Sequence, residues 1–441
     1  MNILFVSLGC DKNLVDSEVM LGILASRGHR MVDDETLADV TVVNTCCFIH
    51  DAKEESIQAI LEMADYKKEG SLKALIVTGC LAQRYQKEIF EEIPEVDAVL
   101  GTASYEKIAE AIDEVLEGGA GLYLEDINVL PETAGKRMLT TGGHYAYLKI
   151  AEGCDKRCTY CIIPKIRGNY RSVPMERLVE EAAELAESGV RELILVAQET
   201  TLYGRDLYGE KSLHKLLRKL CRIDGIWWIR ILYCYPEEID ENLIQVIKEE
   251  PKICHYLDLP IQHASDEILK KMGRRTTKKE LVRIIGRLRE EIPDIVLRTT
   301  LITGFPGEEE IHHRELLNFV DEMEFDRLGV FTYSQEEDTP AADMPDQVSE
   351  EVKEVRQAEL MELQQEIAFD LAEDMVGREV TVMIEGKVAD ENAYVGRTYM
   401  DAPNVDGLIF IDAEEEMMSG DFAKARVTGA LEYDLIGELI K

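Results

Sequence analysis

The sequence predicts an α/β protein with three parts: an N-terminal parallel α/β domain, a central incomplete (β/α)6 barrel and a small C-terminal β-barrel. Apolar runs that alternate with amphipathic stretches predict the first part, because this alternation is typical of parallel sheets. Six further strand candidates separated by helical patterns predict the second. Short alternating strands with turn residues predict the third. A chain of 441 residues is long enough to give each part a hydrophobic core.

The N-terminal domain is predicted to span residues 1–130, where three apolar runs each end in a cysteine. These runs are residues 2–10, 40–46 and 74–80, and amphipathic stretches follow at 51–66 and 84–92. In an open parallel sheet the carboxyl ends of the strands line the ligand crevice, so we expect Cys10, Cys46 and Cys80 to lie together. The alternative is three unrelated thiols buried as small apolar residues.

The central domain is predicted to span residues 140–335, after a polar stretch with several glycines at 131–143. Its strand candidates are residues 145–150, 192–197, 228–233, 255–259, 295–302 and 328–332. Apolar residues recur at helical spacing between them, as at 175–188 and 278–291. Six successive β/α units fit an incomplete barrel, whose functional loops would follow the carboxyl ends of the strands.

The C-terminal part begins with one predicted helix at residues 348–373, within a connecting segment at 345–373 that should dock the last domain. From residue 374 to 441 the pattern changes to short alternating strands, such as 379–385, 407–411 and 423–428. A small β-barrel is the architecture that this pattern favours.

The charge balance is strongly acidic, with 49 Lys and Arg against 87 Asp and Glu and a net charge of −38. This sign opposes nucleic-acid binding and would attract a basic partner, although acidic charge can also simply maintain solubility. No stretch reaches the roughly 20 apolar residues of a membrane span, and the N-terminus does not resemble an export signal. We therefore expect a cytoplasmic protein whose ten cysteines serve metal binding or catalysis rather than disulfides.

A second cysteine group, Cys154, Cys158 and Cys161, forms a compact CxxxCxxC motif just after the first barrel strand. Three thiolates on one loop hold a cubane iron–sulfur cluster and leave its fourth iron open. No fourth cysteine follows nearby, unlike in a ferredoxin run or a structural zinc site. The motif at the mouth of a β/α barrel is the radical S-adenosylmethionine signature, with zinc or chance as the alternative.

Motifs along essentially the whole chain resemble the methylthiotransferase family, and within it the RimO class most closely. They surround Cys10 (SLGCDKN), Cys46 (VNTC) and Cys80 (TGCLAQR), and they continue at residues 152–164, 195–201, 256–265 and 298–308. The resemblance implies a central radical S-adenosylmethionine barrel and a TRAM-like C-terminal barrel. It also implies methylthio transfer to the β-carbon of an aspartate in small-subunit ribosomal protein twelve.

The same resemblance implies two 4Fe-4S clusters. Cys154, Cys158 and Cys161 would hold the cluster that cleaves S-adenosylmethionine into a radical, whereas Cys10, Cys46 and Cys80 would hold the cluster that delivers sulfur. A second S-adenosylmethionine would supply the methyl group. A reductant such as flavodoxin or ferredoxin and a separate sulfur source are the further partners that it implies.

Several positions allow two interpretations. Tyr160, Gln198, Gln262 and Arg298 are candidates for binding S-adenosylmethionine, and each can equally be structural; the same holds for His263. Cys47 directly follows Cys46, where the family more often has a non-cysteine. Because consecutive side chains point in different directions, both are not expected to bind one iron, and we assign Cys46. Cys221, Cys234 and Cys254 lie on helix or strand patterns and are interpreted as core thiols.

Charge distinguishes the possible substrates. Residues 374–441 contain 15 acidic and 6 basic residues, a net of −9 for the part expected to dock the substrate. A surface of this sign repels phosphates and suits a basic ribosomal protein. We therefore predict a protein substrate, with transfer RNA as the alternative. A non-catalytic iron–sulfur electron carrier is the other class that the motifs allow.

Overall fold

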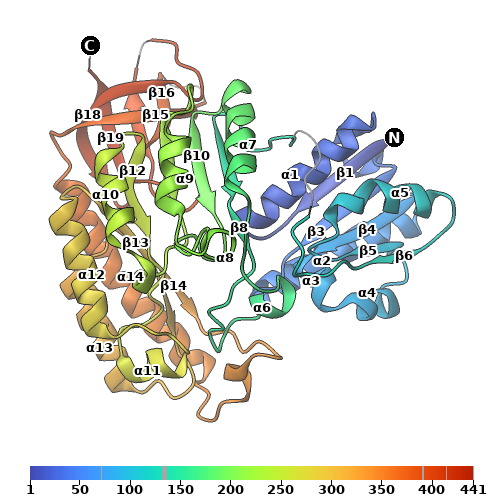
Figure 1. Ribbon diagram of the computed structural model, residues 1–441, viewed down its shortest axis with the longest axis horizontal. Coiled ribbons are helices and arrows are strands. Elements are labelled where there is room, and N and C mark those ends of the chain that lie inside the picture. The colour runs from blue at the N-terminus through green and yellow to red at the C-terminus, as the bar shows by residue number, and fades with distance from the viewer. Residues whose placement is uncertain (71, 132–136, 390–391, 414, 441) are drawn as a thin grey trace. The chain divides into compact units, whose positions relative to one another are not determined.

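The computed structural model describes residues 1–70, 72–131, 137–389, 392–413 and 415–440. The chain divides into two compact units (Figure 1). The first comprises Met1–Thr140, Ala151–Val173 and Ser334–Ala342, and the second comprises Thr141–Ile150, Pro174–Tyr333 and Asp343–Lys441. The loop that carries the CxxxCxxC motif therefore belongs to the same unit as the N-terminal cysteines.

A six-stranded parallel sheet forms the centre of the first unit, in the order β2-β1-β3-β4-β5-β6. Its strands are β1 (Asn2–Ser7), β2 (Arg30–Val32), β3 (Val40–Thr45), β4 (Ala74–Gly79), β5 (Ala98–Leu100) and β6 (Gly121–Tyr123). The helices between them are α1 (Asp11–Ser26), α2 (His50–Lys68), α3 (Cys80–Arg84), α4 (Gln86–Glu92) and α5 (Ile108–Leu116). Since β1, β3 and β4 are direct neighbours, their carboxyl ends meet at one edge of the sheet.

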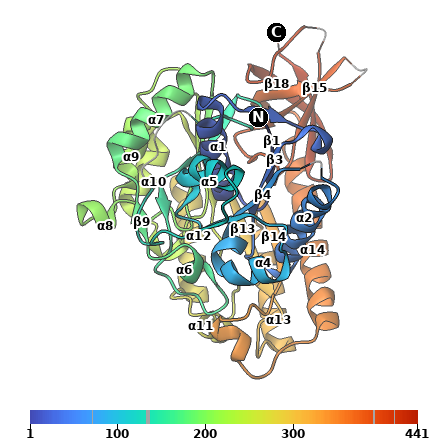
Figure 2. The same cartoon turned by 90° about the vertical axis from the view of Figure 1, so that its right-hand side faces the viewer.

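Apolar side chains cover both faces of this sheet, as expected for parallel strands. On one face α1 and α5 pack through residues such as Leu24 and Ile112. On the other face α2 and α4 pack through Ile60 and Ile89 (Figure 2). This second core also takes in Ile166 from α6 (Ile163–Ile166), which follows the CxxxCxxC loop. The motif loop is thereby attached to the N-terminal sheet.

The second unit contains the other parallel sheet, in the order β14-β13-β12-β11-β10-β7. Its strands are β7 (Tyr145–Lys149), β10 (Glu192–Val196), β11 (Trp228–Ile231), β12 (Ile253–Asp258), β13 (Val296–Thr303) and β14 (Arg327–Thr332). Helices α7 (Met175–Glu187), α8 (Arg205–Tyr208), α9 (Leu213–Leu220), α10 (Glu241–Glu249), α11 (Asp266–Lys271), α12 (Lys278–Glu291) and α13 (Glu310–Met323) connect them. The six strands follow chain order and do not close, which confirms the incomplete barrel.

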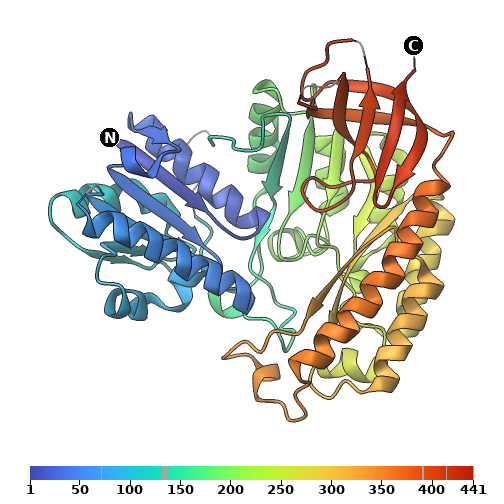
Figure 3. The ribbon, with the colours of Figure 1, turned by 180° about the vertical axis from the view of Figure 1, so that it is seen from behind.

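The C-terminal region adds a long helix and a closed barrel to this unit. Helix α14 (Glu350–Glu373) runs beside α13 (Figure 3), and Gln364 Nε2 donates a hydrogen bond to the carbonyl of Phe325. The closed barrel has the order β15-β16-β17-β19-β18. Its strands are β15 (Glu379–Lys387), β16 (Ala393–Thr398), β17 (Ile409–Asp412), β18 (Phe422–Leu431) and β19 (Asp434–Leu439). The small β-barrel expected from the sequence is confirmed.

Buried ion pairs connect this closed barrel to the larger sheet. Glu192, the first residue of β10, accepts hydrogen bonds from Arg230 and from Arg397 of β16, each at 2.7 Å. Arg327, the first residue of β14, pairs with Asp401. Both contacts lie at the amino ends of the strands. The closed barrel is therefore fixed opposite the carboxyl ends, where functional loops are expected.

The structure differs from the sequence-based expectation in local detail. The amphipathic stretch predicted at 84–92 forms α4 only from Gln86, because Tyr85 between α3 and α4 has φ −116° and ψ 28°. Strands β2, β5 and β6, each of three residues, are too short to show a pattern in the sequence. Part of the expected boundary at 131–143 lies outside the described residues. Within the described part of the chain, no helix is long and apolar enough to cross a membrane.

Candidate active site

The three dispersed cysteines lie at the carboxyl ends of three neighbouring strands. Cys10 caps the amino end of α1 after β1, Cys46 follows β3 directly, and Cys80 is the first residue of α3 after β4. The side chains of Cys46 and Cys80 are buried, whereas Cys10 is exposed. Cys10 and Cys80 both raise the pKa of Cys46, and Cys10 also raises that of Cys80, so the three thiols lie within electrostatic reach of one another. The prediction that the sheet gathers them is consistent with this placement.

Two glycines allow the loops to approach one another so closely. Gly9 has φ +89°, and a Cβ on it would lie 2.7 Å from the Cβ of Cys46 and 3.0 Å from its Sγ. Gly79 has φ +93°, and a Cβ there would lie 2.5 Å from the carbonyl oxygen of Thr45. A residue with a side chain would have to push the strand ends apart. Glycine directly before Cys10 and Cys80 therefore allows these loops to lie close to the loop of Cys46.

Burial shapes the chemistry of this cysteine group. Burial, together with the neighbouring Cys80 and Cys10, raises the pKa of Cys46 to about 12. Burial likewise raises the pKa of Cys80, although Arg167 acts in the opposite direction. Thiols of this kind are held as neutral donors until a metal cluster displaces their protons.

Cys47 is buried in the same apolar core cluster as Cys80. Its side chain is fully buried in the apolar core between the sheet and α2, together with Ile60 and Leu75. Its carbonyl oxygen accepts a hydrogen bond from Arg84 at 3.4 Å. Cys46 instead lies against Gly9, the residue before Cys10. The approach of Cys46 to the Cys10 loop favours Cys46 as the cluster ligand, and this assignment stays a prediction.

Alanine substitution at these two positions is expected to separate their roles. Cys46→Ala should lose the iron of one cluster, about four atoms per chain, because a cubane with two remaining thiolates is poorly held. Cys47→Ala should keep that iron and lose only stability, because it removes a buried sulfur from the core. Iron and sulfide analysis after anaerobic reconstitution measures this. Loss of iron from Cys47→Ala with full iron in Cys46→Ala would contradict the assignment.

The CxxxCxxC loop begins after the short strand β8 (Ala151–Glu152). Gly153 has φ +76°, and a Cβ on it would lie 2.1 Å from the carbonyl oxygen of Asn169. The amide of Cys154 donates to the carbonyl of Gly168 at 3.1 Å, and that of Cys161 donates to Cys158 at 3.1 Å. The start of the loop is thus hydrogen-bonded to the segment that follows it at Gly168, and the three thiols lie on the short stretch between them.

The three thiols of the loop are also close to one another. Burial raises the pKa of Cys161, and Cys158 and Cys154 raise it further. Within the described ranges no group of three His, Cys, Asp or Glu is arranged around a single metal ion. A cubane cluster binds each thiolate through a different iron, so it takes sulfurs that stand farther apart. Both sets of three free cysteines fit such clusters by the chemistry of their donors.

The four candidate contacts for S-adenosylmethionine lie in both units. Tyr160 is a half-buried residue of the CxxxCxxC loop, and Gln198 lies two residues after β10. Gln262 follows β12 with a φ of +72°, and its amide bonds the carbonyl of Thr300 at 2.9 Å. A non-glycine residue held in this conformation is frequent at functional sites. For Tyr160, Gln198 and Gln262 a role in binding stays a prediction.

Arg298 has structural partners at the amino half of β13. Its guanidinium pairs with Asp258 at 3.0 Å and with Asp406 of the C-terminal region at 3.3 Å. Burial lowers the pKa of Arg298, but these carboxylates outweigh it and raise the pKa well above its ordinary value. The contact to Asp406 joins the larger sheet to the closed barrel. Its proposed contact to S-adenosylmethionine stays a prediction beside this role.

The segment Ser334–Ala342 packs on the first unit and touches both cysteine regions. Its buried Glu336 pairs with Arg84 of α3 at 2.9 Å and with Lys53 of α2 at 3.0 Å. The amide of Ala341 bonds the carbonyl of Thr159, inside the CxxxCxxC loop, at 2.9 Å. In the sequence this segment stood out only because prolines interrupt it. Its contacts could not be predicted, because its partners lie far away along the chain and leave no local pattern.

Loss of the Glu336 carboxylate is expected to release this segment. Glu336→Gln leaves the side chains of Arg84 and Lys53 without their buried counter-charge, which costs about 3–5 kcal/mol where such a pair is removed. Amide hydrogen exchange should therefore become faster in residues 334–342 and in α3. Glu337→Gln is the matched control, because Glu337 lies 3.7 Å from the same Arg84 but its side chain is largely exposed, so its loss should cost little. Equal exchange rates in the two variants would contradict this role.

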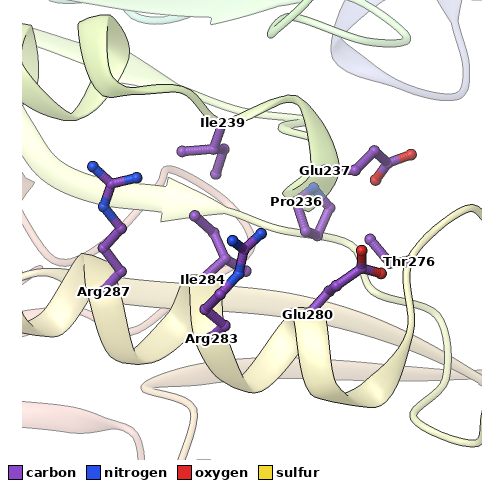
Figure 4. Close-up of a pocket in the computed structure, with 8 residues that line it drawn as sticks. All are labelled: Pro236, Glu237, Ile239, Thr276, Glu280, Arg283, Ile284 and Arg287. Atoms are coloured by element: carbon purple, nitrogen blue, oxygen red, sulfur yellow. The ribbon is translucent and has the colours of Figure 1, made fainter.

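A small cavity elsewhere in the second unit does not belong to this site. It has a volume of about 150 Å³ and lies between η3 (Pro236–Glu238) and α12 (Figure 4). Its lining residues are Pro236, Glu237, Ile239, Thr276, Glu280, Arg283, Ile284 and Arg287. Two arginines balance two glutamates, so the cavity has no preference for an anion or a cation. None of the predicted site residues lines it.

Comparison with known protein families divides the chain into three matches. Residues 2–101 match the uncharacterized protein family UPF0004, residues 148–320 match the radical SAM superfamily, and residues 376–440 match the TRAM domain. The radical SAM match covers the CxxxCxxC loop and most of the larger sheet. The TRAM match covers the closed barrel.

Solved structures show a similar fold. The chain aligns with the radical S-adenosylmethionine methyltransferase TsrM from Kitasatospora setae with a TM-score of 0.53 and 15% identity, covering 88% of this chain and 79% of that one. It aligns with the cobalamin-dependent radical enzyme OxsB with a TM-score of 0.53 and 14% identity, covering 83% and 56%. At this identity the similarity supports the fold alone.

Curated relatives are far more similar in sequence. The ribosomal protein uS12 methylthiotransferase RimO of Lachnoclostridium phytofermentans is 67% identical, with 99% of each chain covered. Those of Desulforamulus reducens and Geobacter sulfurreducens are each 51% identical, with at least 98% of each chain covered. The resemblance that the motifs indicated thus extends over the full length. The chain belongs to the RimO family of methylthiotransferases, enzymes of the radical SAM superfamily.

Proposed function

We propose that this enzyme transfers a methylthio group to the β-carbon of an aspartate in small-subunit ribosomal protein twelve. The observation that carries the proposal is the presence of two three-cysteine sets in one compact unit, one at three adjacent strand ends and one on a single loop. Relatives at 50–67% identity are named ribosomal protein uS12 methylthiotransferases, which supports the transferred group and the protein substrate. Two open clusters meet the need of the reaction for a radical and for a sulfur donor.

The chain's own residues would divide this work. Cys154, Cys158 and Cys161 would hold the first 4Fe-4S cluster, which when bound and reduced supplies the one-electron cleavage of S-adenosylmethionine. Cys10, Cys46 and Cys80 would hold the second, which when bound supplies the sulfur. Gly9, Gly79 and Gly153 give the loops their close approach, and the carbonyl of Gly168 orients Cys154. The protein's contribution is to position these groups and keep water from the radical.

The described surface of the closed barrel supports a basic protein as substrate. Exposed carboxylates there include Glu379, Asp412, Glu415, Glu416, Asp421, Glu432 and Glu438. Two of its four exposed cations in the described residues are already engaged, since Arg426 pairs with Glu379 and Lys424 bonds Thr381. Such a surface repels RNA phosphates and attracts lysine- and arginine-rich protein segments.

Incubation of the reconstituted enzyme with S-adenosylmethionine, a reductant and either substrate tests the proposal. Mass spectrometry should find a methylthio group on the aspartate of the ribosomal protein. A mass gain only on transfer RNA would overturn the choice of substrate. Absence of 5′-deoxyadenosine with both clusters intact would instead indicate an electron carrier.

The cellular setting is part of the same proposal. A reductant such as flavodoxin or ferredoxin would supply the electron, a separate sulfur source would renew the delivered sulfur, and the reaction would take place in the cytoplasm. In the division predicted from the sequence, residues 1–130 would carry the sulfur-delivery cysteines and residues 140–335 those of the radical cluster. Residues 345–373 would connect them to residues 374–441, which would dock the substrate.

A further inference from the structure

Arg167 is a buried cation that lies among the N-terminal cysteines, although it follows the CxxxCxxC loop in sequence. Its side chain is only 2% exposed. Its Nη2 donates a hydrogen bond to the Sγ of Cys80 at 3.4 Å. The other contacts of the guanidinium are to Asp16 at 2.7 Å, Asn13 at 2.9 Å and Glu152 at 3.3 Å. Every one of these partners is in the first unit.

Through Asn13 the guanidinium also reaches the other two strand ends. Asn13 Oδ1 accepts from Arg167, while its Nδ2 donates to the carbonyl of Leu8 at 2.6 Å and to that of Thr45 at 3.2 Å. Leu8 lies two residues before Cys10, and Thr45 lies directly before Cys46. One guanidinium is thus connected to the loops of Cys10 and Cys46 and to the sulfur of Cys80.

The contact to Glu152 connects Arg167 to the other cysteine set. Glu152 is the last residue of β8 and lies two residues before Cys154. Glu152 and Asp16 are both buried, so they require the cation that Arg167 provides. Arg167 therefore lies where the supports of the two cysteine groups meet, and no local pattern in the sequence marks it.

We propose that Arg167 is a positioning residue of the N-terminal cysteine site that also raises the reduction potential of the cluster held there. The proposal rests on the proposed function, because it requires a cluster at Cys10, Cys46 and Cys80. Reduction adds negative charge to a cluster, and both a nearby cation and an N–H···S hydrogen bond favour the reduced form. Arg167 thereby sets the potential at which the sulfur-delivery cluster accepts an electron.

The test uses the full-length chain with Cys154, Cys158 and Cys161 replaced by alanine, so that one cluster remains. Its midpoint potential is measured by redox titration with electron paramagnetic resonance after anaerobic reconstitution with iron and sulfide. Arg167→Gln should shift the midpoint to a lower value, because it removes both the charge and the guanidinium donor. Arg167→Lys should produce a smaller shift, because it keeps the charge.

Arg171→Gln is the matched control, since it removes an arginine four residues away that bonds the carbonyls of Arg167 and Asn169. Its midpoint should equal that of the parent chain. Because Arg167→Gln removes the guanidinium that pairs with Asp16 at 2.7 Å, Asp16→Asn combined with Arg167→Gln is measured alongside to preserve folding.

The proposal for Arg167 would be overturned if the midpoint potential were unchanged in both chains that carry Arg167→Gln, or if Arg171→Gln shifted it equally. Either result would leave the proposal of two clusters unaffected. A parent chain that binds no iron would overturn the proposed function, and with it the role of Arg167.

Discussion

Replacing Cys154, Cys158 and Cys161 together by alanine is expected to abolish the formation of 5′-deoxyadenosine. The three thiols lie on one loop, and no other free cysteine pair among the described residues offers the same spacing. Iron should fall from about eight to about four atoms per chain, because the N-terminal site keeps its own ligands. Chromatography of the nucleoside and iron analysis measure the two effects.

The matched variant replaces Cys10, Cys46 and Cys80 by alanine. It should lose a similar amount of iron and all methylthio transfer, yet still form 5′-deoxyadenosine from S-adenosylmethionine. Cys221→Ala, which changes a buried thiol of the second unit, should retain the iron of both clusters. Nucleoside formation by the Cys154, Cys158 and Cys161 variant, or its loss in the N-terminal variant alone, would reverse the assigned roles.

Glu192→Ala is expected to be strongly destabilising, by about 3–5 kcal/mol. The carboxylate is fully buried and holds two buried guanidinium groups, those of Arg230 and Arg397. Its removal leaves two cations near each other with no shared anion. Because Arg397 belongs to the closed barrel and Arg230 to the larger sheet, the contact between these parts should fail first.

The chain contains a probe for this contact. Its two tryptophans, Trp227 and Trp228, pack against Phe422 of β18 with ring centroids 5.0 and 4.9 Å apart. Denaturant titration followed by tryptophan fluorescence therefore reports the attachment of the closed barrel. Glu379→Ala removes an exposed pair with Arg426 and should cost at most about 1 kcal/mol. If Glu192→Ala and Glu379→Ala lowered the free energy of unfolding by similar amounts, the ion pairs of Glu192 would not be important for stability.

The effect of Glu192 should also depend on pH. Burial raises the pKa of Glu192, but Arg397 and Arg230 outweigh it, so the pKa lies below the ordinary value of 4.5. The stabilisation is therefore present above about pH 4.5 and is lost as the pH falls through the lower pKa of the folded state. The difference in the free energy of unfolding between the wild type and Glu192→Ala should therefore become smaller as the pH is lowered over this range.

Local spacing allowed much of the site to be predicted. CxxxCxxC lies on one loop, so its three thiols are neighbours whatever surrounds them. Cys10, Cys46 and Cys80 depend only on one further condition, a parallel sheet in which β1, β3 and β4 are adjacent, and the alternation of the sequence predicted that sheet. The small C-terminal β-barrel and the incomplete (β/α)6 barrel followed from period and length, whereas the TRAM-like character of the former came from the family resemblance.

By itself, the sequence determined the three-part fold through its periodicity, the two cysteine sets through short spacings and strand ends, and the family through motifs that resemble it. The tertiary structure alone decided three other features. It turned Cys47 into the core, attached Ser334–Ala342 to the N-terminal unit and placed Arg167 beside Cys80. The reason is physical: a buried charge or thiol is tolerated only where partners far along the chain compensate it, and such partners meet only on folding.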